Sequence, residues 1–214
     1  ILMKINAFIP VRMSSSRFPG KPLTKLLDIT MLEHVWRRTK MSDVDETFIA
    51  LCDKETLDIC KKIGAQYIVT SKKHQMCMDR IAEASNKKKS DIIVTVQGDE
   101  PLIRPEMINL TIKQLLKNKK ELFCTTLAQK IFSASEIKNP NRVKIIWNNK
   151  KEVIYISREA IPSSAKYKNK IDFHKMVCVY TMTRKNLKKF QKYGISKNEK
   201  IESIDMLRIL DNGK

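Results

Sequence analysis

Strand-like apolar segments alternate with helix-like amphipathic segments through residues 4–116 of the chain. The strand-like segments cover residues 4–10, 47–52, 66–69 and 91–96. The helix-like segments, with apolar residues three and four apart, cover residues 32–40, 54–63, 78–88 and 105–116. Strands that alternate with helices form βαβ units, so this pattern predicts an α/β fold with a doubly wound, mostly parallel sheet.

The alternation changes after the segment 122–129. The segments 142–147 and 152–157 are β-like and flank the polar turn 148–151, which predicts a small β-hairpin. A further strand at 176–182 and helices at 185–193 and 199–210 complete the expected elements. We therefore expect one domain over residues 1–214, with a soft boundary near residue 130 and a hairpin-containing insertion after it.

Cysteine usage, apolar runs and charge limit the class of protein. The five cysteines are scattered and never form a CxxC pair, which argues against a disulfide framework or a zinc knuckle and favours a cytoplasmic location. No apolar run approaches the roughly 20 residues that would span a bilayer, so we expect no membrane insertion. The net charge of +19 raises nucleic-acid binding as a hypothesis. The lysines are spread along the chain, however, so no nucleic-acid partner is expected.

A basic loop follows the first expected strand. The segment 9–23, IPVRMSSSRFPGKPL, sets Arg12, Arg17 and Lys21 among serines, prolines and a glycine. In this class of fold, phosphates bind at the carboxyl ends of strands, where such a loop would lie. Arginine offers a planar pair of donors to phosphate oxygens, and lysine offers a point charge. Because no Walker motif is present, these residues alone leave phosphate binding and a solvated turn as alternatives.

An acidic turn follows the central strand at 91–96. The segment VQGDEPLI places Asp99 and Glu100 at the same edge as the basic loop, with Gly98 allowing a ligand to come close to the backbone. Mg²⁺ is often held by one or two carboxylates together with phosphates and water. A solvated turn is the alternative for this motif taken alone. Together, however, the two loops provide what nucleotidyl transfer requires: cations for a triphosphate, and a metal site beside the leaving pyrophosphate.

A series of motifs along the chain resembles those of the 3-deoxy-manno-octulosonate (KDO) cytidylyltransferase family, also called CMP-KDO synthetases. The motifs are IPVRMSSSRFPGKPL, LCDKE at 51–55, His74 with Asp79-Arg80, VQGDEP at 96–101, NPNRVK at 139–144, YISREAIP at 155–162 and EKIESIDMLRILDNG at 199–213. The resemblance implies a fold of the nucleotide-diphospho-sugar transferase type. It also implies a nucleotide-binding part at 1–130, a sugar-binding and dimerisation part at 131–214, and a homodimer formed around the 142–157 hairpin.

The activity implied by the resemblance is transfer of CMP from CTP to the anomeric hydroxyl of KDO or a related sugar acid. Pyrophosphate would be released, Mg²⁺ would be the cofactor, and the product would serve lipopolysaccharide or envelope polysaccharide synthesis. Carried over to this chain, the nucleotide-binding residues are Arg12, Ser15, Lys21 and Arg80. The metal ligand is Asp99, which with Lys21 and Arg12 forms the catalytic set. The sugar-binding residues are Gln97, Arg158, His174, Glu199 and Glu202.

The chain departs from the family pattern at three places. Met76-Cys77-Met78 replaces a small polar SGT turn that contacts the nucleotide. In the sugar-binding part, Cys178 replaces a tyrosine and Met206 a glutamine, which removes hydrogen-bonding groups from a pocket for a hydroxyl-rich sugar. The sequence stops at Lys214, before the segment whose aspartate supplies a second metal ligand in the family. These departures leave open a different sugar acid or a catalytically impaired relative, with nucleic-acid binding as the last alternative.

Overall fold

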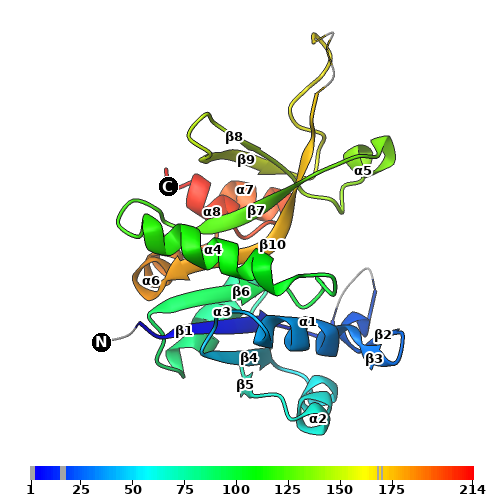
Figure 1. Cartoon of the computed structure of the whole chain (residues 1–214), viewed down its shortest axis with the longest axis vertical. Helices are drawn as coiled ribbons and strands as arrows, with labels where there is room; N and C mark the ends of the chain where they lie inside the picture. Colours follow the sequence, from blue (N-terminus) through cyan, green and yellow to red (C-terminus); the bar gives the residue numbers. More distant parts are fainter. Residues whose placement is uncertain (1–2, 15–17, 168, 170) are drawn as a thin grey trace. The chain divides into compact units, whose positions relative to one another are not determined.

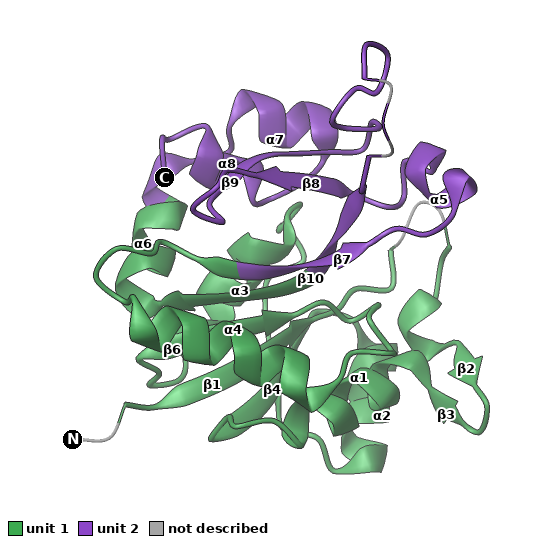
Figure 2. Ribbon diagram, turned by 45° about the horizontal axis from the view of Figure 1, so that its top comes forward, with its two compact units in different colours: residues 1–125, 178–191 green, residues 126–177, 192–214 purple. Residues whose placement is uncertain are grey.

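The computed structural model describes residues 3–14, 18–167, 169 and 171–214 (Figure 1). It contains two compact units, which Figure 2 shows in different colours. Unit 1 comprises residues 1–125 and 178–191, and unit 2 comprises residues 126–177 and 192–214. The first division falls close to the soft boundary expected near residue 130. Residues 178–191, however, return to unit 1, because the second half of a long strand pairs with the central strand of that unit.

Unit 1 is built on a mixed sheet whose strands run in the order β5-β4-β1-β6-β10. Its parallel strands are β1 (Ile5–Pro10), β4 (Glu46–Leu51), β5 (Tyr67–Val69) and β6 (Ile92–Val96). The second half of β10 (His174–Thr183) pairs antiparallel with β6. All five residues of β6 are buried, and Phe8 of β1 stacks on Phe48 of β4 with ring centroids 5.6 Å apart. The mostly parallel sheet expected from the sequence is confirmed.

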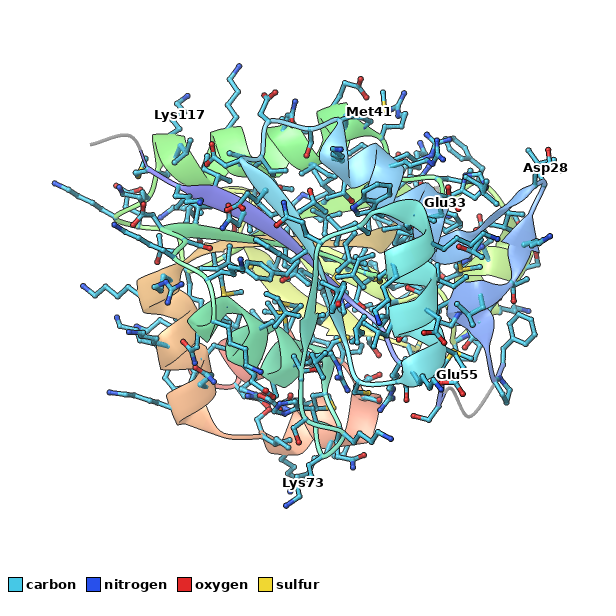
Figure 3. The ribbon with its side chains drawn as sticks, turned by 90° about the horizontal axis from the view of Figure 1, so that it is seen from below. Asp28, Glu33, Met41, Glu55, Lys73 and Lys117 are labelled. Atoms are coloured by element: carbon cyan, nitrogen blue, oxygen red, sulfur yellow. The ribbon has the colours of Figure 1, made fainter. Side chains whose placement is uncertain are left out.

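Helices cover both faces of this sheet. They are α1 (Met31–Lys40), α2 (Lys54–Ile63), α3 (Cys77–Asn86), α4 (Pro105–Lys117) and α6 (Arg184–Tyr193), the last crossing into unit 2 after residue 191. Helices α1 and α4 pack side by side on one face, and α3 packs on β1 and β4 from the other (Figures 1 and 3). Local signals set the helix ends: the Thr30 side chain caps α1 by accepting from Glu33 N, and Gly64 ends α2 at φ 67°.

The basic loop of unit 1 ends in small elements that the sequence did not predict. They are a single 3₁₀ turn, η1 (Lys21–Leu23), and a hairpin of β2 (Lys25–Leu26) and β3 (Ile29–Thr30). At the hairpin turn, Leu27 has φ 58° and is 91 % exposed. Each strand of this hairpin has two residues, too few for a period-two pattern to show in the sequence.

Unit 2 contains the hairpin expected around residues 148–151. Its elements are β7 (Thr125–Lys130), α5 (Ala134–Lys138), β8 (Lys144–Trp147), β9 (Val153–Ser157), the first half of β10, α7 (Lys197–Glu202) and α8 (Leu207–Leu210). Strands β8 and β9 are antiparallel, with a register shift between Ile146 and Trp147. Lys144 of β8 also pairs with Lys175 of β10.

The prediction of one helix over residues 199–210 is wrong. Two short helices occupy this stretch, because Ser203 adopts a left-handed conformation with φ 52° and ends α7. Ile204 N then donates to Glu199 O, which closes the helix end. Within the described ranges, none of the helices has the length and apolar character needed to cross a membrane.

Candidate active site

The acidic turn after β6 lies directly against the end of β1. A Cβ added to Gly98 would come 2.8 Å from Val11 Cγ1 and 3.0 Å from the carbonyl oxygen of Pro10. These distances are too short for any side chain, so this position requires glycine. The sequence suggested that Gly98 brings the backbone close to a ligand; the neighbour found here is the protein chain itself. As a result, the acidic turn and the basic loop start at adjacent points of the sheet edge.

The structure brings together Lys21 and Asp99, which are expected to bind phosphates and metal respectively. Lys21 opens η1 directly after Gly20, which has φ 75°. Its Nζ lies 2.7 Å from Asp99 Oδ2, and the two side chains are 34 % and 49 % exposed. An exposed ion pair of this kind contributes little to stability. Both groups therefore remain accessible to a charged ligand.

Two contacts position the first part of the basic loop. Met13 N donates to Asp53 Oδ2 at 2.8 Å, which fastens the loop to the start of α2. The exposed Arg12 donates from Nη1 to the carbonyl oxygen of Gln75 at 3.3 Å. Ser15, predicted to bind the nucleotide, and Arg17 lie outside the described residues. Sequence reasoning missed Asp53 as a support of this loop, although LCDKE had marked it as part of a motif.

Gln97 lies at the same edge and contacts the segment that departs from the family pattern. Its backbone N–H donates to Cys178 O at 3.1 Å. Its side-chain Oε1 accepts from the Cys77 thiol, with Sγ 3.2 Å away. The residue that replaces a small turn residue of the family therefore contacts a predicted sugar-binding residue. A thiol is a weak donor, so this contact leaves the Gln97 amide easily displaced.

Arg80 is a buried residue in the first half of α3. Its side chain is 3 % exposed, and Nη1 donates to Thr70 Oγ1, just beyond β5. Burial raises the pKa of the neighbouring Cys52 thiol, and the Arg80 guanidinium opposes that rise. The nucleotide-binding role of Arg80 stays a prediction. In this structure its guanidinium holds the end of β5.

The carboxylates at this edge fit a metal carried by phosphates rather than a metal held in a protein cage. In the part of the chain that the structure describes, no group of three or more His, Cys, Asp or Glu could hold a metal ion. Asp99 is half-exposed, and the neighbouring Glu100 accepts from Cys178 N at 3.4 Å. One accessible carboxylate, with phosphates and water completing the shell, is a usual mode of Mg²⁺ binding.

In unit 2, the structure brings together Arg158 and Glu202. Glu202 Oε2 accepts from Arg158 N at 2.9 Å, and Oε1 accepts from Ser157 Oγ at 2.6 Å. The Arg158 guanidinium donates to three backbone carbonyls, those of Glu202, Pro140 and Ser203. These bonds fix the end of β9 against the end of α7. The sugar-binding roles of both residues stay predictions.

Lys144 supports the same junction from the core of unit 2. It is fully buried and donates to the carbonyl oxygens of Asn139 and Arg158. Burial lowers the pKa of Lys144, while the nearby carboxylates of Glu159 and Glu202 oppose that shift. Sequence reasoning included Lys144 in the NPNRVK motif but gave it no role. The buried ammonium group is stabilised by its hydrogen bonds to two backbone carbonyl oxygens, and in turn it satisfies both carbonyls.

The other two predicted sugar-binding residues occupy separate places in unit 2. Glu199 is fully buried, and its carboxylate receives two hydrogen bonds from Arg208, at 2.7 and 2.8 Å. It also completes a capping box with Ser196 at the start of α7. His174 packs its ring edge-on against Trp147, with centroids 4.7 Å apart. Their contacts with a sugar stay predictions, and Glu199 has a clear structural role in holding α7 to α8.

Comparisons with known proteins agree with the resemblance seen in the sequence. The cytidylyltransferase family model matches residues 6–214. The 3-deoxy-manno-octulosonate cytidylyltransferase of Fusobacterium nucleatum is 40 % identical over 99 % of this chain and 86 % of its own length. The enzyme of the same name from Thermodesulfovibrio yellowstonii is 38 % identical over 96 % of this chain and 85 % of its own length.

A solved structure supports the same grouping. It is that of a CMP:2-keto-3-deoxy-manno-octonic acid synthetase complexed with CTP. It superimposes with a TM-score of 0.88 at 32 % identity, covering 98 % of this chain and 86 % of the other. The motifs, the sheet and the pairing of Lys21 with Asp99 are thus found in a chain that belongs to the cytidylyltransferase family, with the 3-deoxy-manno-octulosonate cytidylyltransferases.

Proposed function

We propose that this protein transfers CMP from CTP to the anomeric hydroxyl of KDO and releases pyrophosphate, for lipopolysaccharide or envelope polysaccharide synthesis. One observation carries the proposal: Lys21 Nζ and Asp99 Oδ2 lie 2.7 Å apart at the carboxyl edge of a parallel sheet. This position supports the proposal, because phosphates and their metal bind at the carboxyl edge of the sheet in such folds. The names of the relatives and the CTP held by the solved neighbour support the choice of substrates.

In the proposed reaction, the anomeric oxygen forms a bond to the α-phosphorus of CTP. The bond to the bridging oxygen of pyrophosphate breaks, and the hydroxyl proton passes to solvent. Arg12 and Lys21 would bind the triphosphate and neutralise the charge that develops on the leaving group. Asp99 would hold Mg²⁺, which when bound supplies further neutralisation of the phosphate charge. The protein contributes mainly position and charge, as is usual for phosphate transfer.

Location and assembly are part of the same proposal. We place the protein in the cytoplasm, which the five free cysteines support because thiols persist in a reducing compartment. A homodimer formed around the β8–β9 hairpin follows from the family resemblance and stays a prediction.

A related sugar acid is the second candidate substrate. Cys178, which stands where the family has a tyrosine, supports it. Burial and the nearby Glu100 carboxylate raise the pKa of Cys178 to about 12. The side chain is therefore a neutral thiol, a weaker hydrogen-bond donor than a phenol. A pocket that loses a hydrogen bond to one hydroxyl favours an acceptor sugar that lacks that hydroxyl.

Pyrophosphate release from CTP and Mg²⁺ with a panel of sugar acids tests the proposal. We expect the highest rate with KDO, and a loss of about 100-fold or more in Lys21→Ala and Asp99→Ala. Lys4→Ala is the matched control, because Lys4 forms a similarly exposed pair with Glu46, 2.6 Å long, at the start of β1. A higher rate with a sugar acid other than KDO would select the second candidate. Full activity in both site variants would contradict the proposed site.

A further inference from the structure

The segment 71–76 joins β5 to α3 and borders the candidate active site. One contact attaches the segment there, and a second attaches the residue that follows it. Arg12 Nη1 donates to Gln75 O at 3.3 Å, and Cys77, which follows the segment, lies with its Sγ 3.2 Å from Gln97 Oε1. Arg12 and Gln97 belong to the loops after β1 and β6, between which a parallel sheet of this order binds ligands. The segment therefore forms one wall of the nucleotide site.

A carboxylate on α3, that of Glu83, holds this wall. Glu83 Oε2 accepts from Ser71 N at 2.9 Å and lies 2.6 Å from His74 Nε2. Its other oxygen, Oε1, accepts from Lys87 Nζ at 3.1 Å. Burial opposes ionisation of this carboxyl group, but the hydrogen bonds from Ser71, His74 and Lys87 outweigh it and lower the pKa of Glu83 to about 2. The carboxylate is therefore charged throughout the physiological range and binds Ser71 and His74 of the segment.

Glu83 is the middle member of a row that runs along α3 to its C-cap residue, Lys87. Residues three and four apart on a helix share a face, and 80, 83 and 87 follow this spacing. Arg80 donates to the Thr70 side chain, and Lys87 Nζ donates to Val69 O at 2.7 Å. The row thus forms hydrogen bonds with the chain from Val69, at the end of β5, to His74. Among the described residues of this row, Glu83 is the one that bonds residues of the segment itself.

We infer that Glu83 is a positioning residue for the nucleotide: by fixing Ser71 and His74, it holds the segment 71–76 in place against Arg12 without touching the substrate. The inference rests on the proposed function, because it takes CTP as the ligand of this site. It gives a role to His74, which the sequence motif singled out and the proposed reaction does not use. It also predicts a specific kinetic signature, because a displaced wall weakens nucleotide binding more than it slows the transfer step.

The test compares Glu83→Ala, Glu83→Gln and His74→Ala with the wild-type protein. CTP affinity is measured by calorimetry, and kcat and both KM values are measured by pyrophosphate release. We expect Glu83→Ala to raise the Kd and KM for CTP about tenfold, the equivalent of one charge-assisted hydrogen bond. Glu83→Gln, which keeps an acceptor, should lose less. We expect kcat at saturating CTP and the KM for the sugar acid to stay within about twofold of wild type.

Glu33→Ala is the matched control. Glu33 forms the same kind of helical pair, with Arg37 at 2.7 Å on α1. It lies well away from Lys73 of the segment 71–76 (Figure 3). Amide hydrogen exchange gives a second readout: exchange over 71–76 should quicken in Glu83→Ala and not in Glu33→Ala.

Three outcomes are distinct. Faster exchange over 71–76 with unchanged CTP affinity would overturn the inference. A fall in kcat accompanied by similar rises in both KM values would also overturn it, because such changes indicate general damage to the fold. If Glu83→Ala is poorly folded, the same criteria are applied to His74→Ala. Absence of CTP binding by the wild-type protein would instead overturn the proposed function.

Discussion

Glu83 illustrates how one side chain links stability to pH. Hydrogen bonds lower its pKa from 4.5 to about 2 in the folded protein. A lowered carboxyl pKa gives stability that is fully present above the unfolded value and is lost as pH falls through the folded value. The contribution of Glu83 should therefore be present above pH 4.5 and disappear between pH 4.5 and about 2.

We expect the difference in unfolding free energy between wild type and Glu83→Ala to shrink as the pH is lowered from about 6 to about 3. Urea unfolding at a series of pH values, followed by circular dichroism, measures this difference. The comparison is internal, because the contributions of all other groups are common to both proteins unless they contact Glu83. A difference that stays constant or widens toward low pH would contradict the assignment of a lowered pKa.

At the scale of elements, helices α7 and α8 depend on one buried ion pair. The Glu199 and Arg208 side chains are 0 % and 1 % exposed. Removing one partner leaves the other charged, buried and unpaired. Arg208→Ala should therefore lower the unfolding free energy by about 3–5 kcal/mol, a cost typical of broken buried pairs.

The double variant Glu199→Leu/Arg208→Met should recover much of that loss, since it removes both charges and keeps apolar volume. Chemical denaturation of the three proteins gives the comparison. Lys175→Ala, which breaks a partly exposed pair with Glu136 in the same unit, is the control and should lower the unfolding free energy much less than Arg208→Ala does. Equal decreases in the unfolding free energy for Arg208→Ala and Lys175→Ala would contradict a larger contribution of the buried pair to stability.

The elements also show how far sequence patterns reach. The four parallel strands and helices α1 to α4 were predicted within a few residues, because burial on one or two faces leaves a regular apolar pattern. The split between α7 and α8 was not predicted, since Ser203 carries no signal for a left-handed conformation. Lys21 and Asp99 could be placed at one edge of the sheet, because each follows the carboxyl end of an expected parallel strand. The contacts of Glu83 with Ser71 and His74 could not, because they depend on how a loop folds back onto its following helix.

At the scale of the whole molecule, the net charge of +19 affects the encounter with a polyanionic nucleotide. A large positive field raises the local concentration of CTP and speeds association, and salt screens that field. We expect the KM for CTP to rise severalfold between about 50 and 300 mM KCl, with kcat at saturating CTP little changed. Steady-state pyrophosphate release at several salt concentrations tests this. A KM that is independent of salt would show that the charge is unrelated to nucleotide capture.

The close contact at Gly98 has a consequence for protein engineering. Because no side chain fits between Gly98 and its neighbours, the carbonyl oxygen of Pro10 and the side chain of Val11, the starting points of the basic loop and the acidic turn are held at a fixed separation. Their separation is set by neighbouring strands of the sheet, and altering loop length would not adjust it. Redesign toward a nucleotide with a longer or shorter phosphate chain would therefore have to change the length of side chains such as Lys21. The backbone that carries these side chains would stay unchanged.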